Sequence, residues 1–153
     1  MTQEHPAEGH SDADVRAILG SVRTIAMVGA SANPSKPSYE VLQVLRQAGY
    51  DLIPVNPRSD LAEIQGLAVY PSLQSIDRPV DMVDVFRPSR EFAAIAREAV
   101  DIGAKVLWGQ LGIHDDEAAR IAAAGGLSVV MDRCPKIELE RPSAASEAGG
   151  PSD

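Results

Sequence analysis

The sequence has one cysteine, Cys134, so a disulfide bond between two cysteines of the same chain is excluded. It also lacks the long apolar run of a membrane-spanning helix and the charged-then-apolar N-terminal stretch of a secretory signal. We therefore expect a protein of the reducing cytoplasm with no membrane partner. Aromatic residues are few, at 4%, yet 44% of the 153 residues are hydrophobic, which is enough to bury one core without disulfides or metals.

Positive charge is scarce as well: 14 Lys and Arg residues stand against 22 Asp and Glu residues, for a formal net charge of −8. This balance argues against a protein that neutralises many phosphates of a nucleic acid, but not against one small anionic ligand. Residues 1–14 carry four acidic side chains and no basic one, and residues 140–153 carry three against one. The ends therefore hold −4 and −2 of the total, and the core is nearly neutral.

Composition also separates the two ends of the chain from its core. The first residues have almost no apolar side chains, and the last are rich in Pro, Ser, Ala and Gly. We predict a flexible acidic tail at residues 1–13, one domain at residues 14–139 and a disordered tail at residues 140–153.

Apolar runs of strand length alternate with stretches of helical periodicity throughout the core. Strands are predicted at residues 24–28, 51–55, 80–86, 105–108 and 128–131. Helices are predicted from Ser11 or Asp12 onward, at 39–48, at 89–102 with Ser89 as N-cap, and at 115–124. Residues 58–79 are ambiguous, with a helical turn at 60–64 and a brief strand at 67–70. This order predicts an α/β single domain with a Rossmann-like, doubly wound, mainly parallel sheet and helices on both faces.

Ligands of such sheets bind outside the carboxyl ends of the strands, where Gly, Pro and polar residues gather in this sequence. The segments that follow the predicted strands are Gly29-Ala30-Ser31, Asn56-Pro57-Arg58, Arg87-Pro88-Ser89, Gln110-Leu111-Gly112 and Asp132-Arg133-Cys134. Polar loops follow strands in any fold of this class, so the chemistry of the loops has to decide whether they form a site.

The first of these loops has the composition of an anion site. Backbone N–H groups at the start of the next helix attract a phosphate or pyrophosphate. Side chains that can add donors are those of Ser31, Ser35, Lys36 and Ser38. The loop has neither the Lys-Ser/Thr ending of a P-loop nor a G-x-G-x-x-G pattern, so it supports neither P-loop ATP hydrolysis nor a dinucleotide. Alternatively, Gly29 only permits a tight turn and Ser38 only caps the helix.

The second loop favours a ligand with a further phosphate. In NAD enzymes of this fold an acidic residue holds the ribose hydroxyls, whereas Arg accommodates a ribose phosphate. Here Arg58 follows the strand, which favours NADP or coenzyme A; a solvent-exposed Arg58 without a ligand is the alternative. Lys36, Arg87 and Arg90 add positive charge to the same edge of the sheet.

Several segments occur together in one order: VGAS, KPSYEV, IPVNPR, YPSL, PVDMVDVFRPS, LWGQLG and VVMDRCPKIE. Between residues 22 and 138 the sequence thereby resembles the small bacterial coenzyme A-binding proteins of the YccU-like family. These proteins are single-domain relatives of the coenzyme A-binding domain in the succinyl-CoA synthetase alpha subunit. The resemblance implies a Rossmann-type domain that binds coenzyme A, or an acyl-CoA, along the carboxyl ends of the strands.

The resemblance also implies a role for each matching segment. It places Gly29, Ala30 and Ser31 at the pyrophosphate, with Lys36, Pro37 and Ser38 beside it. It places Asn56, Pro57 and Arg58 near the ribose phosphate. It places Phe86, Arg87, Pro88 and Ser89 on the adenine side, and Gln110, Leu111 and Gly112 toward the pantetheine.

Residues for catalysis are not evident in the sequence. Two of the three histidines lie in the predicted N-terminal tail, and His114 precedes acidic residues typical of a helix start. No metal-ligand cluster or Ser-His-Asp grouping is apparent, and Asp84 is expected to bind loop backbone amides. We predict a protein that binds coenzyme A without catalysis of its own. The alternatives are an NADP-dependent reductase, a CoA-dependent enzyme component acting with a partner, and an interaction module whose loops contact protein.

Overall fold

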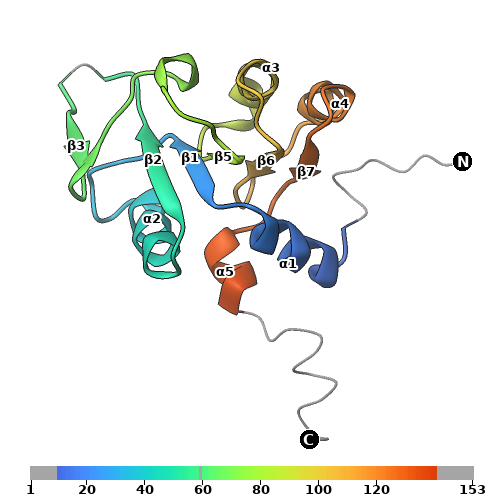
Figure 1. Ribbon diagram of the computed structural model, residues 1–153, viewed down its shortest axis with the longest axis horizontal. Helices are drawn as coiled ribbons and strands as arrows, with labels where there is room; N and C mark the ends of the chain where they lie inside the picture. Colours follow the sequence, from blue (N-terminus) through green and yellow to red (C-terminus); the bar gives the residue numbers. More distant parts are fainter. Residues whose placement is uncertain (1–9, 59, 141–153) are drawn as a thin grey trace, which may run out of the picture.

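The computed structural model describes residues 10–58 and 60–140, and its main feature is a five-stranded parallel sheet (Figure 1). The strands are β1 (Thr24–Val28), β2 (Asp51–Val55), β5 (Met82–Val85), β6 (Val106–Gly109) and β7 (Ser128–Val130). They lie in the order β2-β1-β5-β6-β7, and every neighbouring pair is parallel. The predicted α/β class with a Rossmann-like parallel sheet is therefore confirmed.

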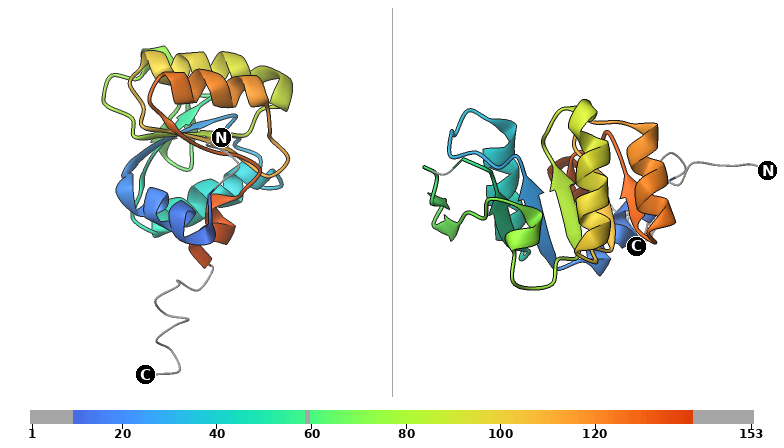
Figure 2. Two further views of the ribbon diagram at one scale, coloured as in Figure 1. Left: turned by 90° about the vertical axis from the view of Figure 1, so that its right-hand side faces the viewer. Right: turned by 90° about the horizontal axis from the view of Figure 1, so that it is seen from above.

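Helices cover both faces of the sheet (Figure 2). One face carries α3 (Ser89–Asp101) and α4 (Asp116–Ala124); the other carries α1 (Asp12–Ser21), α2 (Pro37–Gln47) and α5 (Pro135–Glu140). All residues of β5 and β6 are buried, since successive side chains alternate between the two helix layers. The core therefore has two halves, one around Phe92 and Leu107 and the other around Leu42 and Trp108.

The segment between β2 and β5 differs from the prediction. The helical turn predicted at residues 60–64 is wrong, because β3 (Glu63–Ile64) pairs with β4 (Leu67–Ala68) as an antiparallel hairpin. Gln65 and Gly66 between them have φ values of 51° and 81°, as a two-residue hairpin turn with positive φ at both positions requires. A short 3₁₀ helix, η1 (Leu73–Ser75), then leads toward β5.

The start of α1 agrees with the prediction, and the start of α3 does not. Ser11 is the N-cap of α1 and forms a capping box with Asp14, as its hydroxyl accepts from the Asp14 N–H at 3.0 Å. Ser89 is not the N-cap of α3, since that position is taken by Pro88. The Ser89 hydroxyl instead accepts from the backbone N–H of His114 at 3.0 Å. It therefore holds the loop after β6 against α3.

The predicted tails overlap the described residues at both ends of the chain. Helix α1 begins at Asp12, inside the segment 1–13 that we predicted as a tail, and residues 1–9 lie outside the described part of the chain. Helix α5 was not predicted; it has six residues, too few to show helical periodicity, and it packs on α1 and α2. Residues 141–153 of the predicted C-terminal tail lie outside the described part as well. None of the described helices is long and apolar enough to cross a membrane.

Candidate functional site

A cavity of about 530 Å³ lies at the carboxyl ends of the strands. It is located at the point where the order in which strands join the sheet reverses. From β1 the chain proceeds to β2 on one side, and later returns to β5 on the other side of β1. Doubly wound sheets bind their ligands at this switch point, and the volume lies in the range of small-molecule sites. The lining residues are Gly29, Ala30, Ser31, Lys36, Pro37, Ser38, Asn56, Phe86, Arg87, Gln110, Leu111 and Ile113.

Eleven of these twelve lining residues are among the sixteen that we predicted as ligand contacts. The five predicted residues that do not line the cavity are Pro57, Arg58, Pro88, Ser89 and Gly112. Ile113 lines the cavity but was not predicted, although it directly follows the predicted segment Gln110-Leu111-Gly112. Since the carboxyl ends of parallel strands meet at one edge, segments distant in sequence come together here.

The loop after β1 is held in shape by its own short polar side chains. Gly29 has a φ of +93°, which side chains rarely tolerate, and its N–H donates to Val55 O at 3.1 Å. The Ser31 hydroxyl accepts from the Asn33 N–H at 3.0 Å, and Asn33 Oδ1 accepts from the Ser35 N–H and hydroxyl. Ser35 was expected to offer a donor to the ligand, but it does not line the cavity and its hydroxyl serves this turn.

The amino end of α2 forms one wall of the cavity. Lys36 is the N-cap and makes no side-chain capping hydrogen bond, Pro37 is the first helical residue, and all of Lys36, Pro37 and Ser38 line the cavity. Ser38 is only 4% exposed. A helix start without a side-chain cap leaves backbone N–H groups and the positive end of the helix dipole available to an anion. This wall is therefore suited to a phosphate.

Asn56 joins the two loops at the β1 and β2 ends. Its Nδ2 donates to Ala30 O at 2.8 Å, and its Oδ1 accepts from the Arg58 N–H at 2.9 Å. Both side-chain polar atoms are thus used to hold backbone, which leaves Asn56 a positioning role at the edge of the cavity.

The charged groups at the cavity are basic. Lys36 and Arg87 line it, and no acidic side chain does among the residues that the structure describes. Arg87 also forms a two-bond ion pair with Glu91, at 2.9 Å for each bond, and these hydrogen bonds lower the pKa of Glu91. Arg87 therefore reaches the cavity in a fixed orientation, with its charge shared with Glu91.

Arg58 lies outside the cavity lining and is engaged elsewhere. Its guanidinium forms two hydrogen bonds with Asp60, at 3.2 and 2.8 Å, and both side chains are exposed. The hydrogen bonds from Arg58 lower the pKa of Asp60. A ligand phosphate would have to compete with Asp60 for this guanidinium.

Gln110 provides an unsatisfied hydrogen-bond acceptor at the cavity. The residue follows β6, is 7% exposed and lines the cavity. Its buried Oε1 has no hydrogen-bond partner within residues 10–58 and 60–140. Buried polar groups are normally paired, so this atom is suited to receive an N–H from a bound molecule.

Comparison with known proteins identifies the family of the chain. The sequence matches the CoA binding domain over residues 23–140. The chain belongs to the CoA-binding domain family. The protein YneT of Bacillus subtilis (strain 168) is 39% identical over 127 residues, which cover 83% of this chain and 93% of YneT. A solved structure of a protein from Pyrococcus horikoshii OT3 has 36% identity and a TM-score of 0.83, covering 92% of this chain and 98% of that one.

Larger proteins contain a segment similar to this CoA-binding domain. The alpha subunit of the ADP-forming acetate–CoA ligase I of Pyrococcus furiosus is 32% identical over 104 residues. The match covers 61% of this chain and only 22% of that subunit. The resemblance to coenzyme A-binding domains that the sequence motifs predicted is therefore confirmed.

Asp84 departs from its predicted role in this CoA-binding domain. It lies in the centre of the sheet, in register with Met27 and Trp108, and is completely buried. Neither carboxyl oxygen has a hydrogen-bond partner in the described part of the chain, so the prediction that it binds loop amides is wrong. Burial raises the pKa of Asp84 well above its ordinary value. Burial therefore disfavours ionisation of this carboxyl.

Among the described residues, neither His114 nor any acidic side chain lines the main cavity. The Nε2 of His114 lies 3.7 Å from Asp116 Oδ1 on an exposed surface. Among the described residues, no group of three or more His, Cys, Asp or Glu side chains could hold a metal ion.

Proposed function

We propose that the protein binds coenzyme A or an acyl-CoA in the cavity, and that it acts as a binding protein without chemistry of its own. The observation that carries the proposal is the wall formed by the amino end of α2. Its N-cap offers no side chain to its own first turn, its residues Lys36 and Ser38 face the cavity, and Arg87 adds a second positive charge. Membership of the CoA-binding domain family supports the same ligand.

The cavity offers partners to both polar parts of coenzyme A. The pyrophosphate would lie against the loop that begins at Gly29 and the amino end of α2, where backbone N–H groups and the helix dipole favour anions. The pantetheine arm contains amide N–H groups, and one of them would satisfy the buried Oε1 of Gln110. The arm would thus leave the cavity past Leu111, which lies beside Gln110.

Thermal unfolding with a panel of ligands tests this proposal. A ligand at 100 times its Kd stabilises the folded protein by about 2.7 kcal/mol. We expect a rise in Tm with coenzyme A and acetyl-CoA, and smaller rises with NADPH, NADH and ATP at equal concentration. A rise with NADPH alone would instead support the reductase-like alternative, and no rise with any of these compounds would support an interaction module.

Arg58 and Asp60 give a residue-level prediction about the ribose 3′-phosphate. Since Asp60 holds the Arg58 guanidinium, Asp60→Asn should free it and strengthen coenzyme A binding, whereas Arg58→Ala should weaken that binding by about tenfold, roughly 1.4 kcal/mol. Dephospho-CoA lacks the 3′-phosphate, so its Kd should change little in either variant. Isothermal titration calorimetry of the wild type and both variants measures the six dissociation constants.

Arg90→Ala serves as the matched control, because Arg90 is also an exposed arginine outside the cavity lining and the proposal assigns it no contact with the ribose phosphate. The assignment of Arg58 to the ribose phosphate fails if Asp60→Asn and Arg58→Ala change the Kd of dephospho-CoA as much as that of coenzyme A.

A further inference from the structure

A second hollow, of about 320 Å³, adjoins the cavity at Leu111, which lines both. It lies between the loops after β6 and β7, the start of α1, and α5. Its lining residues are Asp12, Leu111, Asp132, Arg133, Cys134, Ile137 and Glu138. The two hollows are therefore neighbours along the path that the pantetheine arm would take past Gln110 and Leu111.

Two exposed hydrophobic side chains meet at this second hollow. Leu111 is 54% exposed and Ile137 is 39% exposed, and they are the two exposed large hydrophobic side chains in the described part of the chain. Both line the second hollow, together with Cys134, which is 5% exposed. Two such side chains at one recess indicate a place where an apolar group is bound.

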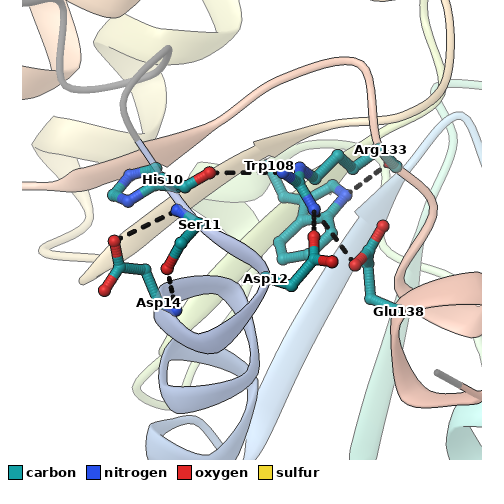
Figure 3. Close-up of polar contacts among 7 residues, drawn as sticks. All are labelled: His10, Ser11, Asp12, Asp14, Trp108, Arg133 and Glu138. Atoms are coloured by element: carbon teal, nitrogen blue, oxygen red, sulfur yellow. Dashed lines mark hydrogen bonds and ion pairs between the residues drawn. The ribbon is translucent and has the colours of Figure 1, made fainter. Parts of the chain in front are cut away.

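The polar side of the second hollow is already internally paired. Arg133 Nη1 donates to Asp12 Oδ1 at 3.0 Å and to Glu138 Oε1 at 3.1 Å, and its Nη2 donates to His10 O at 3.2 Å (Figure 3). The indole N–H of Trp108 donates to Arg133 O at 2.7 Å, which fixes the backbone as well (Figure 3). The guanidinium therefore faces two carboxylates of this chain.

The charged side chains that line the second hollow are mostly acidic. Among the lining residues, three carboxylates, those of Asp12, Asp132 and Glu138, stand against the guanidinium of Arg133. A ligand group that carries its own carboxylate would meet repulsion here and would compete for Arg133 with two residues already bound to it.

We propose that the second hollow receives the acyl group of an acyl-CoA, and that it selects an uncharged aliphatic chain of several carbons over one that ends in a carboxylate. This inference rests on the proposed binding of coenzyme A in the main cavity. At about 30 Å³ for each water molecule in the liquid, the volume is that of roughly ten water molecules, which leaves room for such a chain. The thioester would lie near Leu111, where the two hollows meet.

Calorimetric titration of the full chain with coenzyme A, acetyl-CoA, butyryl-CoA, hexanoyl-CoA and succinyl-CoA tests this proposal. We expect affinity to rise along the aliphatic series, by about two- to fourfold for each methylene that is buried. Butyryl and succinyl groups both have four carbons, so this pair isolates the effect of the terminal carboxylate. We expect succinyl-CoA to bind at least tenfold more weakly than butyryl-CoA.

Ile137→Glu should abolish the preference for longer chains, because it places a charge where the chain would lie. Gln43→Glu is the matched control: it adds the same charge on an exposed position of α2 that lines neither hollow.

A measurement on the unmodified protein avoids dependence on how the variant folds. Cys134 is the single cysteine of the sequence and lines the second hollow, so saturating hexanoyl-CoA should slow its alkylation by iodoacetamide at least fivefold more than saturating acetyl-CoA.

The outcomes separate this inference from the proposed function. Equal affinities for coenzyme A and all its thioesters, with equal alkylation rates, would overturn the acyl site and leave the binding of coenzyme A intact. Tightest binding of succinyl-CoA would overturn the preference for uncharged chains. Absence of binding by every member of the series would overturn both proposals.

Discussion

Gly29→Ala is expected to lower the free energy of unfolding by about 3 kcal/mol and to weaken ligand binding by more than tenfold. A side chain at φ +93° costs about 1–3 kcal/mol in itself. A Cβ at this position would also lie 3.0 Å from Phe86 O and 3.1 Å from Arg87 Cδ, and such overpacking adds about 1–3 kcal/mol. Since Phe86 and Arg87 line the cavity, the displacement would reach the site itself. Urea denaturation and calorimetric titration measure the two effects.

Gly49→Ala is the matched control for the steric part of this effect. Gly49 has a similar φ of +103°, but a Cβ there would meet no atom within 4 Å. The control should therefore show only the conformational cost of a side chain at positive φ and should bind ligand normally. If both variants lose the same stability and bind equally well, the close approach of the β1 loop to Phe86 is not important for the site.

Asp84→Asn is expected to change the pH dependence of stability more than any other single substitution in the sheet. Burial raises the pKa of Asp84 in the folded state above its value in the unfolded chain, so the folded state holds its proton more tightly. The resulting contribution to the free energy of unfolding is fully present below about pH 4. It is lost as the pH rises toward the folded-state pKa, by up to about 1.4 kcal/mol for each pH unit. Asparagine cannot ionise, so the variant should gain stability relative to the wild type as the pH increases.

Urea denaturation of the wild type and Asp84→Asn between pH 4 and pH 8 measures this difference. The other titratable groups contribute equally to the free energy of unfolding of both proteins, so their effects cancel in the difference. Asp81→Asn is the control with the opposite sign. Burial raises the pKa of Asp81, but hydrogen bonds from the backbone N–H groups of Thr24 and Arg23 and the charge of Lys105 outweigh it and leave that pKa lowered. The stabilisation by Asp81 is therefore present above the unfolded-state pKa and is lost as the pH falls through the folded-state pKa. A pH-independent difference between Asp84→Asn and the wild type would mean that Asp84 remains ionised in the core.

Local sequence patterns were sufficient for the long elements of this protein. The apolar runs of β1 and β6 are short and continuous because both faces of a parallel sheet are covered, and this pattern distinguishes them from the amphipathic helices between them. The brief strand predicted at residues 67–70 is confirmed by β4, but its partner β3 was predicted as a helical turn, since a strand of two residues carries no alternation to detect. Helix α5 was missed for the same reason of length, although its surface completes the second hollow.

The location of the candidate site also follows from the sequence, because parallel strands place all their carboxyl ends at one edge. That rule alone brings the segments around Gly29, Asn56, Arg87 and Gln110 to the same cavity. It does not say which side chain in each segment faces the cavity. Pro57 and Pro88 belong to the right loops, yet neither lines it.

Sequence by itself thus determined the succession of the five sheet strands and the four longer helices along the chain, the fold class and the edge of the sheet at which a ligand would bind. Only the tertiary structure decided which polar groups are already paired: Arg58 with Asp60, Ser89 with His114, and Arg133 with Asp12 and Glu138. It also decided that Asp84 has no partner among the described residues. The physical reason is that periodicity is a property of neighbours along the chain, whereas hydrogen bonding and burial depend on distances between side chains from different elements.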